Sequence, residues 1–227
     1  MNSYEDSVKE YQSLNKLAKS GGAVVMGGDS DLFLPVGELR ESFGLETTVY
    51  NRSVAGLTVG AAADFFDACV APLKPSCLLV RLGEAEHDSF TDAAAAGFVR
   101  DCRSLVEHIR SANPKCEVFL LSMNVRGAAD PERAEAVNEA LRAAAKAANC
   151  GFEDVDALGE GSLAACESAC FVYSIGFVAP LPVRTPVHNL VRILYGYGNV
   201  GANLAARQNK DRGQAAKRLN VTAVSLF

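Results

Sequence analysis

Short apolar runs alternate with helical patterns along most of this 227-residue chain. Five runs have the length and apolar character of buried β-strands, at residues 22–27, 47–50, 76–82, 116–121 and 151–155. Helical patterns occur before the first run and between the others, at about 4–19, 58–71, 93–111 and from residue 130. Parallel neighbouring strands need a crossover connection, usually a helix, so this alternation is typical of a sheet covered on both faces. We therefore expect an α/β protein, a three-layer α/β/α sandwich around a five-stranded parallel sheet.

The helical segments carry start and stop signals. Apolar residues recur at helical spacing between Phe98 and Ile109, and Pro114 follows them where a helix should end. Asp130 before Pro131 is typical of an N-cap followed by the first helical residue. These signals support the expected succession of strands and helices.

Composition and charge exclude several classes of protein. With 49% apolar and 22% charged residues, the chain can bury one core and is too apolar to be disordered. We expect a single domain over 1–227, with an N-terminal helix at about 4–19 and a basic helical tail at about 187–227. The tail is interpreted as a solvated helix rather than an anion-binding segment. A net charge of -5 opposes nucleic-acid binding, which depends on lysine and arginine.

Targeting and metal-binding signals are not evident. The first residues lack a secretory pattern, and no apolar run approaches the roughly 20 residues that span a bilayer. This predicts a cytoplasmic protein without a membrane partner. Seven cysteines form no CxxC pair, so neither a disulfide framework nor a zinc site is indicated. Cys166 and Cys170 could share a helix face but lack further ligands. We expect no metal and no cofactor.

A candidate nucleophile follows the first apolar run. Residues 23–26 lead directly into Gly28, Asp29 and Ser30, and a strand that stops there presents the serine hydroxyl at the rim of the sheet. Ligands of parallel α/β sheets bind at the carboxyl ends of strands. Ser30 could instead cap a helix that begins near Asp31. We expect Asp29 to brace the loop by accepting backbone N–H bonds.

The Gly-Asp-Ser motif ending at Ser30, the segment 51–56 and His188 occur in an order that resembles the SGNH (GDSL) hydrolases. The resemblance implies a flavodoxin-like fold and a serine esterase or acylhydrolase that cleaves a small ester. It implies that Ser30 is the nucleophile and His188 the general base and then acid. The backbone N–H groups of Ser30 and Gly56 would belong to the oxyanion hole.

Two blocks depart from the family pattern. The aspartate of the D-x-x-H arrangement is Thr185 here, and the asparagine that donates to the oxyanion is absent. A gapless match puts Ala85 in its place, whereas a two-residue insertion puts His87 there, and histidine can donate. Thr185, Asp88 or a neighbouring glutamate could orient the histidine.

The departures leave two functions open. Loss of one oxyanion donor costs about 10²-fold to 10³-fold in turnover. Loss of the orienting acid costs roughly 10⁴-fold. The alternative to the esterase is therefore a catalytically lapsed SGNH-like domain that binds a ligand or protein partner at the same crevice.

Overall fold

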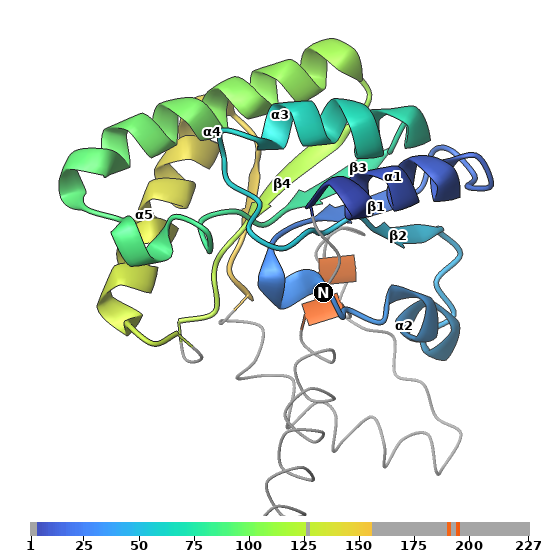
Figure 1. Ribbon diagram of the computed structural model, residues 1–227, viewed down its shortest axis with the longest axis horizontal. Helices are drawn as coiled ribbons and strands as arrows, with labels where there is room; N and C mark the ends of the chain where they lie inside the picture. The colour runs from blue at the N-terminus through green and yellow to red at the C-terminus, as the bar shows by residue number, and fades with distance from the viewer. Residues whose placement is uncertain (1–3, 126–127, 156–189, 192–193, 196–227) are drawn as a thin grey trace, which may run out of the picture.

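The computed structural model describes residues 4–125, 128–155, 190–191 and 194–195. Within these residues, five parallel strands form one sheet in the order β2-β1-β3-β4-β5 (Figure 1). The strands are β1 (Ala23–Met26), β2 (Val49–Asn51), β3 (Cys77–Val80), β4 (Glu117–Leu121) and β5 (Gly151–Glu153). The expected α/β class and the five-stranded parallel sheet are thus confirmed.

Helices cover both faces of the sheet, as Figure 1 shows. One face packs against α1 (Tyr4–Asn15), α3 (Ala62–Phe65), α4 (Asp92–Ala112) and α5 (Pro131–Ala148). The other face packs against α2 (Val36–Ser42) and against four described residues near the C-terminus, Leu190, Val191, Leu194 and Tyr195. The remainder of the expected tail at 187–227 lies outside the described residues.

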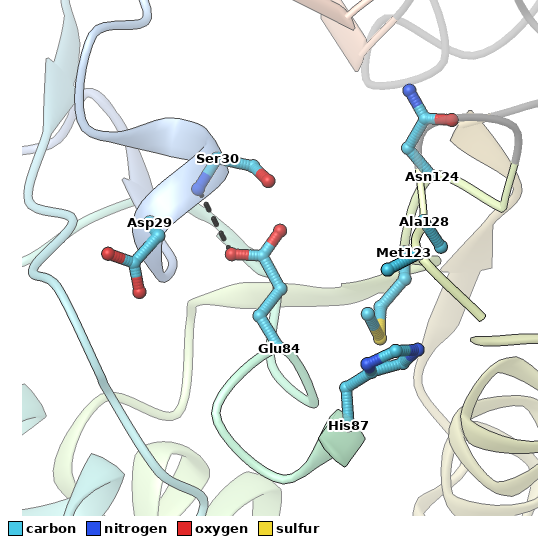
Figure 2. A pocket seen from close by; sticks show the side chains of 8 residues that line it. Asp29, Ser30, Glu84, His87, Met123, Asn124 and Ala128 are labelled. Atoms are coloured by element: carbon cyan, nitrogen blue, oxygen red, sulfur yellow. Dashed lines mark hydrogen bonds between the residues drawn. The ribbon is translucent and has the colours of Figure 1, made fainter. Parts of the chain in front are cut away.

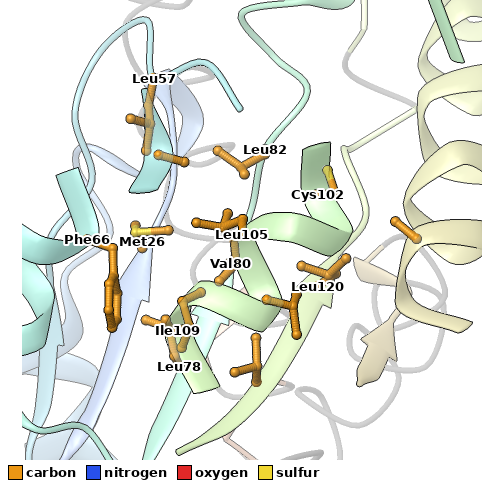
Figure 3. Packing of buried hydrophobic residues seen from close by; sticks show 14 of the residues in the cluster. Met26, Leu57, Phe66, Leu78, Val80, Leu82, Cys102, Leu105, Ile109 and Leu120 are labelled. Atoms are coloured by element: carbon orange, nitrogen blue, oxygen red, sulfur yellow. The ribbon is translucent and has the colours of Figure 1, made fainter. Parts of the chain in front are cut away.

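Alternating strand residues supply the two cores. Val24, Leu78 and Val118 are register partners in adjacent strands, and all three belong to the core under α3, α4 and α5. Figure 3 shows this core, in which Leu78 lies beside Ile109 of α4. Val25 and Leu79, one position later along their strands, point into the opposite core. Burial on both faces explains why these strands read as continuous apolar runs.

Helix boundaries differ from the sequence expectation in three places. The first helix ends at Asn15, not at residue 19, because the backbone N–H groups of the next residues bond three positions back instead of four, as Leu17 does to Leu14. The Asn15 side chain donates to the carbonyl oxygen of Cys69. The helix expected at 58–71 begins at Ala62 and changes to a π-helical turn over Phe66–Val70. Helix α2 was not expected, since its seven residues are too few to show a periodic pattern.

Candidate active site

Ser30 lies just beyond the carboxyl end of β1. Gly27 and Gly28 follow the strand, and Asp29–Asp31 forms a single 3-10 turn. A side chain at position 27 would collide with the Asp31 carboxylate, so glycine is required there. Ser30 is exposed within this turn, and no side chain caps it, so the interpretation of Ser30 as a helix cap is wrong. The turn presents the Ser30 hydroxyl at the rim of the sheet.

A cavity of about 320 Å³ opens beside this serine (Figure 2). Its walls come from the loops after β1, β3 and β4, and they consist of Asp29, Ser30, Glu84, His87, Met123, Asn124, Ala128 and Ala129. Because β2 and β3 lie on opposite sides of β1, the strand order changes direction at this point. Parallel α/β sheets bind their ligands at such a switch point.

Both backbone N–H groups expected in the oxyanion hole donate to carboxylates. The Ser30 amide lies 3.0 Å from Glu84 Oε2, as the dashed line in Figure 2 marks. The Gly56 amide lies 3.0 Å from Asp29 Oδ2, and Gly56 has a φ of +67°, which favours glycine. Asp29 therefore braces the loop as the sequence indicates. Neither amide is free to bind a substrate oxygen in this arrangement.

His87, the expected substitute donor, is buried in the cavity wall next to Met123 (Figure 2). Its Nδ1 lies 3.1 Å from Asp88 Oδ1, and its Nε2 lies 3.1 Å from the carbonyl oxygen of Asp130, the N-cap of α5. The imidazole thus links the β3 loop to α5. Asp88, an expected orienting residue, contacts His87 here.

The other residues that the sequence places near Ser30 are not seen in contact with it in the described part of the chain. Glu86 accepts a hydrogen bond from the Val59 amide at 2.7 Å. Ala85 is exposed and brings no donor. Thr185 and His188 lie outside the described residues, so their contact with Ser30 stays a prediction. Leu190, two positions after His188, is buried in the core beneath β1 and β3.

No protein-family model and no curated protein matches this chain. Solved structures do. A protein from Streptococcus pneumonia described as a platelet activating factor is 20% identical, with 68% of this chain and 76% of that chain covered at a TM-score of 0.58. A GDSL-like lipase from Bacteroides thetaiotaomicron is 18% identical, with 65% and 77% covered at 0.51. Another protein described as a GDSL-like lipase, from Parabacteroides merdae, is 16% identical, with 79% and 96% covered at 0.51.

The chain has the SGNH (GDSL) hydrolase fold. At identities of 16–20% the likeness concerns the architecture, because different chemistries occur on one fold. Chemistry must therefore be argued from the residues around Ser30.

A buried ion pair lies beneath the turn that carries Ser30. Arg81 Nη1 is 3.0 Å from Asp31 Oδ1, and the side chains are only 4% and 1% exposed. Arg81 Nε also donates to the Ser122 carbonyl oxygen at 3.2 Å. Burial lowers the pKa of Arg81, but Asp31, Tyr195 and Glu84 together raise it by more, so the net pKa is raised and the guanidinium stays charged. The pair joins the loops after β1, β3 and β4.

This ion pair reaches two further side chains. The guanidinium carbon of Arg81 lies 5.5 Å from the centre of the Tyr195 ring, and Arg81 Nη2 lies 3.9 Å from Glu84 Oε1. Glu84 in turn accepts the Ser30 amide. Sequence reasoning missed this set, although an arginine at the end of a buried apolar strand signals a buried partner.

Asn138 of α5 holds the wall opposite Ser30. Its Oδ1 accepts the Met123 amide at 2.7 Å, and its Nδ2 donates to the Met123 carbonyl oxygen at 3.2 Å. Asn138 is 1% exposed, so both bonds are shielded from water. They fix the chain after β4, where Met123 and Asn124 line the cavity.

Metal-ion clusters and membrane-spanning helices are both absent from the described residues. Among the described residues, no three His, Cys, Asp or Glu side chains gather to hold a metal ion. Of the helices that the structure describes, none is both long and apolar enough to cross a bilayer. Cys69, Cys77, Cys102 and Cys116 are buried free thiols, and Cys166 and Cys170 lie outside the described part.

Proposed function

We propose that the chain is a serine hydrolase of the SGNH type that cleaves a small ester at Ser30. The main support is the position of Ser30, exposed on the turn after β1 and next to the cavity at the switch point of the sheet. The cavity volume of about 320 Å³ lies near the lower end for small-molecule sites. A small acyl group and a small alcohol fit that volume. The expected cytoplasmic location belongs to the same proposal.

In this mechanism, Ser30 Oγ attacks the ester carbonyl carbon while His188 takes the hydroxyl proton. The carbonyl oxygen becomes negatively charged in the tetrahedral intermediate and binds to the N–H groups of Ser30 and Gly56. Collapse of the intermediate breaks the ester C–O bond, and His188 gives its proton to the leaving alcohol. Water then releases the acid from Ser30 by the same steps. Thr185 is the residue proposed to orient His188.

A second candidate is a non-catalytic SGNH-like domain that binds a ligand or protein partner at this crevice. One observation favours it specifically: both N–H groups of the expected oxyanion hole donate to Glu84 and Asp29. The segment 83–86 also supplies no side-chain amide donor. Chemical reactivity of Ser30 separates the two candidates.

The test is a fluorophosphonate probe, which reacts with a serine that a neighbouring base activates. We expect one adduct per wild-type chain, at Ser30 by peptide mapping, and none in Ser30→Ala. His188→Ala should slow labelling at least about 10³-fold. Ser111→Ala is the matched control, because this serine is exposed on α4 and its hydroxyl donates to the Glu107 carbonyl oxygen. It should label like the wild type.

Two results would contradict the esterase. Folded wild-type protein that does not react leaves the non-catalytic candidate. Equal labelling of wild type and Ser30→Ala places the reactive serine elsewhere.

A further inference from the structure

The Glu84 carboxylate lies directly on the serine turn. Its Oε2 is 3.0 Å from the Ser30 amide nitrogen, and a Cβ added to Gly28 would come within 2.8 Å of the same oxygen. The Glu84 side chain is 15% exposed, and its Oε1 is 3.9 Å from Arg81 Nη2. Both oxygens are thus directed at groups of the site, as Figure 2 shows for the Ser30 side.

The charge on Glu84 Oε2 resembles the charge of the reaction intermediate. A tetrahedral intermediate on Ser30 carries a negatively charged oxygen, which needs the Ser30 N–H group as a donor. Glu84 Oε2 is a negatively charged oxygen that already holds this donor. A carboxylate left there would also repel the developing oxyanion. Glu84 and the intermediate therefore compete for one amide.

We propose that Glu84 is a built-in occupant of the oxyanion hole, which keeps the resting site closed until it moves away. The inference rests on the proposed function and adds a regulatory residue to it. Arg81 offers the alternative position: its Nη2 is 3.9 Å from Glu84 Oε1, so a side-chain rotation away from Ser30 can form a full ion pair with Arg81. Asp29 does not close the site in the same way. Its side chain is exposed, so water can replace it as the acceptor of the Gly56 N–H group.

The expected change in kcat/KM follows from the strength of the hydrogen bond between the Ser30 amide and Glu84. A hydrogen bond to a charged group stabilises the closed arrangement enough to reduce the open population by about 10-fold to 100-fold. Glu84→Ala should raise kcat/KM for p-nitrophenyl acetate by that factor. Glu84→Gln keeps the volume and loses the charge, so it should raise kcat/KM by about threefold to tenfold, since neutral hydrogen bonds are weaker.

The experiment measures turnover and a second quantity that needs no catalysis. Wild type, Glu84→Ala, Glu84→Gln and the control Glu117→Gln are assayed with p-nitrophenyl acetate, each against its Ser30→Ala background. Glu117 is exposed at the start of β4, at the opposite end of the sheet. Exchange of the Ser30 amide proton with D₂O is followed by NMR. We expect faster exchange in both Glu84 variants and no change in Glu117→Gln.

The outcomes separate this inference from the proposed function. Wild type that labels at Ser30, with Glu84→Ala and Glu84→Gln no faster than it, overturns the inference and leaves the hydrolase. Unchanged amide exchange in the folded variants overturns the inference whatever the ester assay shows. Faster exchange without labelling or turnover in any protein removes the proposed function, although Glu84 then still holds the amide.

Discussion

The middle of the strands and their carboxyl ends are built from different side chains. Val24, Leu78 and Leu120, in the middle of the sheet, are fully buried among other apolar groups. Beyond the carboxyl ends the chain buries polar side chains instead. Among the described residues these are Asp31, Arg52, Ser53, Arg81, His87, Ser122 and Asn138. The first six lie in the loops that follow β1, β2, β3 and β4, and Asn138 bonds to Met123 after β4.

The difference separates the source of stability from the source of chemistry. Apolar burial stabilises by about 0.8 kcal/mol per buried methylene group. A buried polar group costs free energy unless it is fully bonded. Asp31 and Arg81 bear part of that cost where they hold the loops after β1, β3 and β4 around Ser30. Substitutions in the two regions should therefore have different signatures.

The largest effect should come from Arg81→Met. This change leaves Asp31 buried without its cation, and breaking a buried pair from one side costs about 3–5 kcal/mol. The free energy of unfolding from urea titration measures the loss. Because the pair joins three loops, fluorophosphonate labelling of Ser30 should slow as well.

The double variant Arg81→Met/Asp31→Asn serves as the control. It leaves no uncompensated charge, so it should recover a large part of the lost stability. Labelling should stay slow, since the loops remain unjoined. Additive losses in the double variant would show that the pair does not act as a unit.

A somewhat smaller effect is expected in the middle of the sheet. Leu78→Ala removes a fully buried side chain and leaves a cavity, which costs about 2–5 kcal/mol. Under conditions where the variant is folded, the labelling rate of Ser30 should equal that of the wild type. A slowed rate would mean that the strand interior also positions the site, and the contrast between the regions would fail.

Much of the fold was predictable because apolar periodicity is local. Each strand overlaps an expected apolar run, α4 is followed by the stop signal Pro114, and α5 begins at the start signal Asp130–Pro131. The strand order was implied by the resemblance to a flavodoxin-like fold and not by periodicity. By contrast, α2 and the π-helical turn depend on packing, which no short pattern records.

The candidate site also combines features that the sequence predicts with features that only the folded loops produce. The position of Ser30 and the bracing role of Asp29 follow from motifs in the sequence, whereas the choice of the Gly56 amide as the partner of Asp29 does not. The Arg81 to Asp31 pair and the Glu84 to Ser30 bond join residues 50 and 54 positions apart. A side chain's charge is visible in the sequence, whereas its partner depends on the folded loops. The motif thus predicts a Ser30 amide that is free to bind substrate, whereas in the structure Glu84 accepts its hydrogen bond.

The smallest effect of a single residue concerns pH and the apolar region. Among the described residues, Cys69, Cys77, Cys102 and Cys116 are buried in the apolar cores, and burial raises the pKa of Cys69 to about 11 and of the other three thiols to about 12. Unfolded thiols titrate near 9.0. Their folded pKa exceeds the unfolded value, so their contribution to stability is complete below pH 9. It is lost as pH rises toward 11 to 12, because unfolding then releases protons.

We therefore expect the free energy of unfolding to fall between pH 8 and pH 10, by on the order of 1 kcal/mol for each buried thiol. Tyrosine phenols titrate in the same range, so Cys102→Ala isolates one thiol from this background. It should lower stability at pH 8 but flatten the change between the two pH values. Urea titrations of both proteins at both pH values measure this difference. Identical pH dependence would show that Cys102 ionises as easily in the folded protein as in the unfolded chain. In that case burial in the apolar core would not raise the pKa of the Cys102 thiol, and the contrast between the two regions would not extend to pH.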